Sequence, residues 1–292
     1  MKVYIISSAR MEELYVEDWI NHHLSLGVDK IIINDNNDEN YPYKLKDAID
    51  KKYIDSGKVI VEDFSKSNEY VKIDDPNYFG NDENLSYIYS WLYNKYKNEF
   101  DWCVKLDIDE YLEIPETNND IKKFLSLDKF KNYDTIAISW VQKTISKNLP
   151  NEAKEYYFPI SVQERCKTLD FRVHYWFKGI ARSLNKKINF NFHLPTSDSI
   201  PLEKTCLVNG ISVREAIDKK FCDIRNDIEE CFYVNFNNTM KLSKYAYLNH
   251  YRFRSNEEIY FFRLVKFDRT KYYDDKIPTR DLYKIYIKSK CK

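Results

Sequence analysis

Short apolar runs alternate along this chain with stretches of helical periodicity, and this alternation restricts the fold more than any other feature. Ile31-Ile32-Ile33 is a continuous apolar run, which is typical of a strand buried in a parallel sheet. The stretch before it, residues 12–27, carries apolar side chains at helical spacing and ends in Gly27. Further strands are predicted at residues 3–6, 59–61, 102–106 and 135–140, with helices at 45–53, 85–96 and 121–130. This order predicts an α/β fold with a mixed, mostly parallel sheet covered by helices.

A length of 292 residues fits one α/β domain with appended helices. We assign residues 1–255 to this domain. Within it, residues 196–240 mix prolines, asparagines and short apolar runs, and we interpret them as an insertion. Ser255-Asn256-Glu257-Glu258 is a capping box, and it predicts that a helix opens a C-terminal helical extension over residues 256–292, packed on the domain.

The charge and cysteine content narrow the classes of function. Lys+Arg 46 and Asp+Glu 46 cancel, which argues against a sequence-independent nucleic-acid binder because such a protein carries a basic excess. The 6 cysteines are scattered without CxxC spacing, which disfavours a zinc site or a disulfide framework. The N-terminal apolar run turns polar at Ser7, too early for a signal peptide, and no apolar run approaches the roughly 20 residues of a membrane helix. We therefore expect a cytoplasmic protein without a transmembrane segment.

The strongest chemical signal is the pair of carboxylates in Asp107-Ile108-Asp109, directly after a predicted strand. On an extended strand, residues two apart face the same side, so Asp107 and Asp109 are expected to point together. Converging carboxylates repel unless a cation joins them, and Mn²⁺ or Mg²⁺ accepts such oxygen ligands while leaving positions for phosphate oxygens. The alternative is an acidic strand end that only makes a loop soluble.

Three weaker signals accompany this pair. His250, just before the capping box, could be a third ligand for Mn²⁺, or a histidine packed at a helix start. Lys178 and Arg182, four residues apart around a glycine and followed by His193, could embrace a diphosphate, although surface pairs of this kind are common. The polar loop 35–38 could bind a base or ribose, or be a plain turn. His23 falls on the apolar side of the first helix, which favours a core role.

Taken together, these segments resemble the family-92-like and family-2-like glycosyltransferases of GT-A fold. Residues 12–30, with Trp19, His22 and the Leu26-Gly27-Val28-Asp29 run, look like the opening motif of that group, and Asp35-Asn36 matches its strand ending. Residues 102–112 are similar to its Trp-x-x-x-x-Asp-x-Asp-Glu-Phe-Leu, with Tyr111 in place of Phe. Residues 178–182 with His193, and His250-Tyr251 with Ser255 and Lys266, resemble two later motifs. The four motifs occur in the family's order and leave out roughly residues 196–240.

The resemblance implies a GT-A domain over residues 1–255 that transfers a sugar from a nucleotide-sugar, most simply a UDP-sugar, with Mn²⁺ or Mg²⁺. Asp107 would contact the donor and the metal, and Asp109 and His250 would ligate the metal. The expected nucleobase and ribose contacts are Ser8, Arg10, Glu12 and Asp35, and the expected phosphate contacts are Lys178, Arg182 and Lys266. Residues 196–240 would be an insertion or an acceptor-side region.

Glu164, beside Arg165, resembles a Glu-Arg pair of the family and is the candidate catalytic base, with Glu152, Glu155 and Asp170 as alternatives. A base for sugar transfer has to reach the acceptor hydroxyl within hydrogen-bond distance. Two departures from the family put the donor sugar in doubt: Asp18 replaces a Glu, and the family's Trp-x-x-Phe-Gly-Ser segment is reduced to Trp140-Val141-Gln142-Lys143-Thr144.

Two other functions compete with sugar transfer. A metal-dependent nucleotidyltransferase also uses paired carboxylates on an α/β sheet, but it typically needs a phosphate-binding glycine loop, and none is visible with Gly 5 in the chain. A non-catalytic sugar- or nucleotide-binding protein could share the fold.

For the transferase, the expected role is polysaccharide biosynthesis, with a glycan or glycolipid acceptor and peripheral association with the inner face of the membrane.

Overall fold

A computed structural model of the chain describes residues 1–10, 12–13, 15–37, 43–67, 82–145, 166–168, 176–191, 193–225 and 228–251. The strands are β1 (Val3–Ala9), β2 (Lys30–Asp35), β3 (Val59–Glu62), β4 (Trp102–Lys105), β5 (Glu110–Glu113), β6 (Thr135–Ile145), β7 (Cys166–Thr168), β8 (Phe177–Arg182), β9 (Thr205–Leu207), β10 (Asp223–Arg225), β11 (Ile228–Tyr233) and β12 (Tyr247–His250). The α-helices are α1 (Val16–Ser25), α2 (Lys51–Asp55), α3 (Asp82–Tyr96), α4 (Ile121–Leu125), α6 (Val213–Asp218) and α7 (Phe236–Ser243). Short 3₁₀ turns are η1 (Leu45–Ala48), η2 (Phe64–Lys66), η3 (Pro115–Thr117), η4 (Asp128–Phe130) and η6 (Leu202–Lys204).

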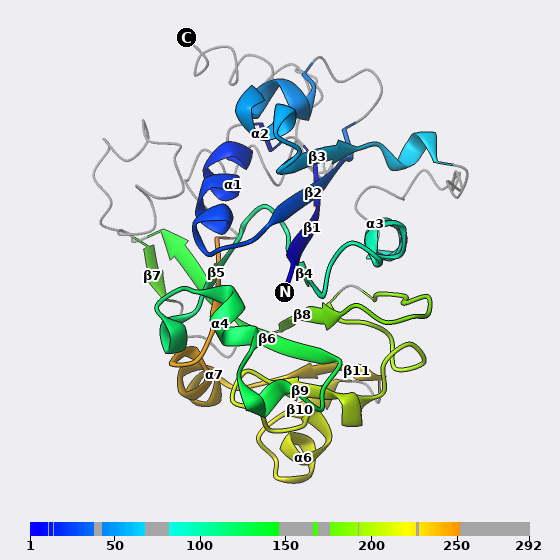
Figure 1. Cartoon of the computed structure of the whole chain (residues 1–292). Helices are drawn as coiled ribbons and strands as arrows, with labels where there is room; N and C mark the ends of the chain where they lie inside the picture. The colour runs from blue at the N-terminus through cyan, green and yellow to red at the C-terminus, as the bar shows by residue number, and fades with distance from the viewer. Residues whose placement is uncertain are drawn as a thin grey trace, which may run out of the picture.

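One mixed sheet organises these elements, in the strand order β3-β2-β1-β4-β8-β6-β12-β5, with β7 and β9 also paired to β6 (Figure 1). Strands β3, β2, β1 and β4 are parallel to one another, and so are β6, β9 and β12. Strands β8, β5 and β7 run antiparallel to their neighbours. The predicted fold class, an α/β mixed and mostly parallel sheet covered by helices, is therefore confirmed. Across the part of the chain that is described, no helix combines the length and apolarity needed to cross a membrane.

The alternation of side chains along β1 divides the core between the two faces of the sheet. Val3 and Ile5 belong to the cluster that includes Trp19 of α1, whereas Tyr4 and Ile6 belong to the cluster that includes Leu92 of α3. Accordingly, α1 and α3 lie on opposite sides of β1 and β2 (Figure 1). Successive strand residues point to opposite faces, so one short apolar strand supplies both layers. Beyond these apolar residues, β1 continues in polar residues at the carboxyl edge of the sheet.

Side chains of α1 satisfy the outer backbone edge of strand β5. The Trp19 indole N–H donates to the Glu110 carbonyl at 2.8 Å, and His22 Nε2 donates to the Leu112 carbonyl at 2.8 Å. The Leu112 N–H donates to His23 Nε2 at 3.3 Å, so His23 must carry its proton on Nδ1, which donates to the Trp19 carbonyl at 2.8 Å. An exposed strand edge would leave these groups unpaired. The histidines of the opening motif thus fix the strand that carries Glu110.

We expect the stability of the protein to fall in mild acid because of His23. Burial, followed by the neighbouring His22, holds the pKa of His23 well below its usual range, and protonation at Nε2 would set two N–H donors face to face. Because the unfolded state binds this proton near pH 6.5 and the folded state does not, the free energy of unfolding should drop by up to about 1.4 kcal/mol per pH unit below that point.

The matched variant is His23→Phe. It should cost about 1–3 kcal/mol at pH 7.5, because the buried Leu112 N–H loses its acceptor, and it should lose the His23 part of the pH dependence. Denaturant unfolding of both proteins at pH 7.5 and 5.5 measures this difference. An equal loss of stability between the two pH values in both proteins would show that His23 does not titrate as described.

Two predicted helices, at 45–53 and 121–130, are interrupted in the structure. The helix predicted at 45–53 is broken at Ile49, which is extended, because the Asp50 side chain accepts the Lys52 N–H at 2.9 Å and starts a new helix, α2. The helix predicted at 121–130 ends at Leu125, and η4 follows after Leu127, which is extended. Residues 196–240 contribute β9 to the main sheet and also form α6 and the separate β10-β11 pair. The predicted extension 256–292 lies outside the described residues.

Gly179 allows the segment around Leu194 to pack closely against β8. A Cβ on Gly179 would lie 3.2 Å from Leu194 Cδ2 and 3.3 Å from Pro195 Cδ. We therefore expect Gly179→Ala to lower the free energy of unfolding by about 1 kcal/mol, since overpacking outweighs the smaller gain from a stiffer unfolded chain. Thermal and denaturant unfolding measure this change. A variant as stable as the native chain would mean that this packing is looser than it looks.

Candidate active site

The polar ends of several strands meet at one edge of the sheet. In the register of β1 and β2, Ser8 pairs with Asn34, and Ala9 pairs with Asp35, the last residue of β2. The Leu106 N–H donates to the Ile6 carbonyl at 3.2 Å, so the residues after β4 leave the sheet beside the end of β1. Strand β8 is antiparallel to β4, and its early residue Lys178 therefore comes to the same edge. Ligands of open α/β sheets bind at this carboxyl edge.

Asp107 and Asp109 lie in a turn between β4 and β5, which differs from the extended strand assumed from the sequence. Strand β4 ends at Lys105, and the Glu110 N–H donates to the Asp107 carbonyl at 3.1 Å. The chain has to turn here because β5 pairs with β12, at the far side of the sheet from β4. Consequently, the two aspartates contact different partners.

Asp107, whose side chain is 34% exposed, forms an ionic group with the buried side chains of Lys178 and Glu110. Lys178 Nζ lies 2.6 Å from Asp107 Oδ2 and 3.4 Å from Glu110 Oε1, and the side chains of Lys178 and Glu110 are 3% and 0% exposed. The Tyr89 hydroxyl donates to Asp107 Oδ1, and the Asp107 N–H donates to Glu110 Oε2 at 2.9 Å. Both carboxylate oxygens of Asp107 are thus engaged within the protein.

Burial and Lys178 act in opposite directions on the two acids. Burial would raise the pKa of Asp107, but the adjacent Lys178 ammonium holds it below its usual value. For Glu110, burial dominates and raises the pKa well above the usual value, although Lys178 opposes this. Burial favours loss of the Lys178 proton, yet the facing carboxylates outweigh it and raise the pKa of Lys178. One ammonium is therefore shared unequally, with Asp107 as its main partner.

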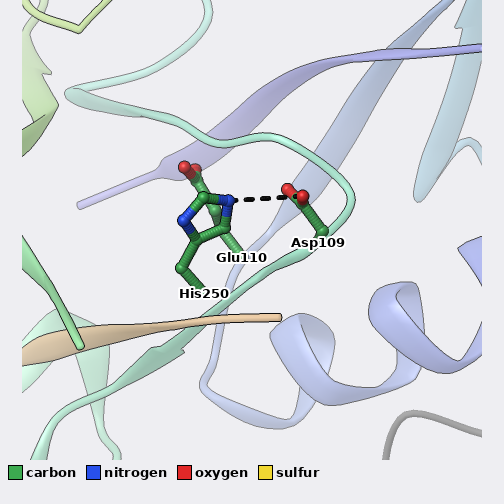
Figure 2. A group of neighbouring side chains, drawn as sticks. All are labelled: Asp109, Glu110 and His250. Atoms are coloured by element: carbon green, nitrogen blue, oxygen red, sulfur yellow. Dashed lines mark ion pairs between the residues drawn. The ribbon is translucent and has the colours of Figure 1, made fainter. Parts of the chain in front are cut away.

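Asp109, Glu110 and His250 form a group that could hold a metal ion. One potential ligand atom from each lies within 4.8 Å of the others, and His250 Nε2 is 3.3 Å from Asp109 Oδ2. Figure 2 shows the three side chains together, with Asp109 on the turn, Glu110 at the start of β5 and His250 at the end of β12. Among the described residues, Glu110 Oε1 is buried without a hydrogen-bond partner. Two carboxylates with one imidazole suit Mn²⁺ better than Mg²⁺, which prefers oxygen ligands, so the residues fit the expected ion.

The structure brings Asp109 and His250 together, as the metal prediction requires. In the group described above, the second acid is Glu110, whereas Asp107 faces Lys178 and Tyr89. Sequence reasoning did not single out Glu110 or Tyr89. Glu110 directly follows the Asp-x-Asp pair, so its position was a usable signal. Tyr89 lies on α3, and nothing in its sequence context points to Asp107.

The residues predicted to bind the nucleoside are grouped near the end of β1. The backbone of Ser8 is close enough to the Tyr89 hydroxyl to lower the pKa of Tyr89, and this hydroxyl donates to Asp107 Oδ1. The Asp35 carboxylate accepts the N–H groups of Asn37 at 3.1 Å and Leu45 at 3.2 Å, so it also orders its own loop. Arg10 and Glu12 follow on the connection from β1 to α1. Their roles in binding stay predictions.

The structure does not bring Arg182 to the same place as Lys178. Arg182 pairs with Trp102 at the beginning of β4, the opposite end of that strand from Asp107. Its guanidinium donates to the carbonyls of Tyr133 at 3.2 Å and Phe130 at 3.3 Å and lies 4.2 Å from the Trp102 ring centroid. We therefore do not include Arg182 in the proposed site.

A row of aromatic rings in mutual contact connects His250 with His193. The Trp140 ring centroid is 4.3 Å from that of His250 and 5.4 Å from that of His193, and His193 stacks on Trp176 at 4.9 Å. Burial, followed by the charges of Lys178 and Lys105, lowers the pKa of His193 to about 2, so this imidazole is neutral. The candidate base Glu164, its alternatives Glu152, Glu155 and Asp170, and Lys266 lie outside the described residues and stay predictions.

Comparison with known proteins gives partial likenesses in structure. No protein-family model matches the chain, and no curated protein sequence matches it. S. aureus TarS 1–349 in complex with UDP aligns at 15% identity and a TM-score of 0.32, covering 52% of this chain and 38% of that chain. A CMP:2-keto-3-deoxy-manno-octonic acid synthetase complexed with CTP aligns at 12% identity and a TM-score of 0.32, covering 63% of this chain and 75% of that chain.

A third structure, a glycosyltransferase involved in the glycosylation of the major capsid of PBCV-1, aligns at 14% identity and a TM-score of 0.23, covering 47% of this chain and 52% of that chain. Likenesses of this extent do not identify the function of the chain. The function has to be inferred from the chemistry of its own residues.

Proposed function

We propose that this chain is a metal-dependent glycosyltransferase that binds a nucleotide-sugar, preferably a UDP-sugar, at the carboxyl edge of its sheet. The observation that carries the proposal is the meeting of Asp109, Glu110 and His250 beside the ion pair of the buried Lys178 with the partly exposed Asp107. A set of acidic and imidazole ligands next to a buried ammonium suits a divalent ion together with a diphosphate. The Asp-x-Asp pair, His250 and Lys178 are also among the residues that resemble the family-92-like and family-2-like glycosyltransferases.

Different residues of the chain would bind different parts of the donor. Lys178 would contact the diphosphate as a compact ammonium, whose pKa the facing carboxylates raise against the effect of burial. Asp107, with its carboxylate held between Lys178 and Tyr89, would accept a hydroxyl of the ribose or the sugar. Ser8, Arg10, Glu12 and Asp35 would surround the nucleobase and ribose. Asp109 and His250, with Glu110, would hold Mn²⁺, which neutralises charge on the departing nucleoside diphosphate when bound.

The residues proposed to act on the acceptor lie outside the part of the chain that the structure describes. We propose that a hydroxyl of a glycan or lipid-linked acceptor attacks the donor's anomeric carbon, with Glu164 as base and Lys266 as a further phosphate contact. The proposed location is the cytoplasm, at the inner face of the membrane, in polysaccharide biosynthesis. The buried thiols of Cys103, Cys206 and Cys222 are in keeping with a reducing compartment.

Release of UDP tests this function. Purified protein is offered a panel of UDP-sugars with and without Mn²⁺, and free UDP is measured. We expect UDP release that depends on the metal, at first by slow transfer to water and faster with the right acceptor. Release of pyrophosphate from a nucleoside triphosphate would instead indicate a nucleotidyltransferase. Binding of UDP-sugars without turnover in the presence of acceptor glycans and glycolipids would indicate a binding protein.

A further inference from the structure

Lys178 lies where a metal-binding acid and a donor-binding acid meet. We propose that Lys178 serves as an internal counter-cation, so that the divalent ion binds well only when a nucleotide diphosphate is present. This inference rests on the proposed function, because it assumes that Asp109, Glu110 and His250 hold the metal. It adds that metal and nucleotide binding are coupled, and that one buried side chain carries much of the coupling.

The geometry gives one carboxylate two competing partners. Glu110 Oε1 lies 3.4 Å from Lys178 Nζ, and Glu110 also belongs to the group whose ligand atoms lie within 4.8 Å of one another. Its other oxygen, Oε2, accepts the Asp107 N–H at 2.9 Å, which fixes the carboxylate in place. A metal ion bound to Glu110 would therefore lie close to the Lys178 ammonium.

Lys178 cannot avoid this repulsion in the nucleotide-free protein. Its side chain is 3% exposed, its ammonium lies 2.6 Å from Asp107 Oδ2, and the Trp140 ring covers it with its centroid at 5.6 Å. The other charges that act on this group are Asp109 and the buried Lys105, whose ammonium donates to the Asn191 carbonyl at 2.9 Å. Screening by solvent is weak for buried charges, so an ammonium and a divalent ion in this space oppose each other strongly.

A diphosphate would change this balance because it brings further negative charge next to both cations. Its oxygens could take the Lys178 ammonium as a partner in place of Glu110, which would free Glu110 Oε1 for the metal. Coupling between binding sites is reciprocal, so the metal must strengthen nucleotide binding by the same factor.

Titration of the full chain with Mn²⁺ tests this inference without any turnover. Calorimetry and the spin-resonance signal of free Mn²⁺ give the affinity with and without saturating UDP, after correction for the Mn²⁺–UDP complex in buffer. For the native chain we expect UDP to tighten Mn²⁺ binding about tenfold or more. For Lys178→Met, we expect nucleotide-free Mn²⁺ binding to become about tenfold tighter than in the native chain and the effect of UDP to shrink by that factor.

Two further variants keep the result interpretable. Lys178→Arg retains the charge and should keep weak nucleotide-free Mn²⁺ binding. Lys178→Gln removes the charge while its amide can still donate to Asp107, and it replaces Lys178→Met if circular dichroism shows that the methionine variant is unfolded. A lysine that only contacted phosphate would weaken UDP binding in both neutral variants and leave nucleotide-free Mn²⁺ binding unchanged, and this would overturn the inference.

The outcomes for the native chain separate this inference from the proposed function. Equal Mn²⁺ affinity with and without UDP would overturn the coupling while leaving a metal-dependent transferase intact. Failure of the native chain to bind Mn²⁺ under either condition would overturn both.

Discussion

Replacing Asp109 with asparagine is expected to lower metal-dependent UDP release by about two to three orders of magnitude. The asparagine keeps the size of the side chain and the Asp109 carbonyl that accepts the Tyr251 N–H at 2.9 Å, so the turn should be preserved. It removes the carboxylate that lies 3.3 Å from His250 Nε2. A metal that stabilises a leaving group contributes several kcal/mol to catalysis, and each 1.4 kcal/mol corresponds to a factor of ten in rate.

Asp120→Asn is the matched control for this substitution. Asp120 is an exposed cap of α4 whose carboxylate accepts the Lys123 N–H at 2.9 Å, and asparagine caps a helix about as well as aspartate. We expect this variant to release UDP at the native rate. If Asp109→Asn retained native activity and native Mn²⁺ affinity, Asp109 would have no part in binding the metal.

Replacing Lys178 with methionine is expected to lower the free energy of unfolding by about 3–5 kcal/mol in metal-free protein at neutral pH. Methionine fills a similar volume but leaves Asp107 and the buried Glu110 without their cation, and uncompensated buried charge carries a cost of this size. Denaturant unfolding measures the change. Because burial raises the pKa of Glu110 in the folded state, protonation relieves the cost, so the loss of stability should shrink as the pH is lowered.

Lys122→Met is the control because its ion pair has the same length and an aspartate about as exposed as Asp107 (34%), but a lysine that is not buried. Lys122 Nζ lies 2.6 Å from Asp29 Oδ1, with the two side chains 40% and 33% exposed. Exposed pairs contribute about 0–1 kcal/mol, so this variant should be nearly as stable as the native chain. Equal losses in the two variants would show that the Lys178 pair is no more than an ordinary surface contact.

The strands of the fold could be predicted because their signal is local. An apolar run such as Ile31-Ile32-Ile33 is buried on both faces of the sheet and needs no partner to be recognised. The pairing of β5 with β12 had no such signal, because it joins residues more than one hundred positions apart. Helix ends were missed where a short side chain competes with the helix, as Asp50 does when it starts α2.

Part of the candidate site could be predicted from the expected topology of the sheet. The carboxyl ends of parallel strands meet at one edge, so residues placed after β1, β2 and β4 were expected to converge. The pairing of Lys178 with Arg182 as phosphate contacts assumed that cations four residues apart lie together, which holds on a helix. On strand β8 they are separated by about 13 Å, at 3.3 Å per residue. Tyr89 required the three-dimensional arrangement, whereas Glu110 could have been singled out because it directly follows the Asp-x-Asp pair.

Diffraction at the manganese absorption edge, from crystals of the full chain grown with UDP and Mn²⁺, tests the proposed site most directly. We expect one strong manganese peak in contact with the Asp109 carboxylate and His250 Nε2, with the UDP diphosphate against Lys178. A manganese ion bound away from these residues, or UDP bound away from the carboxyl ends of β1, β2 and β4, would contradict the proposed function.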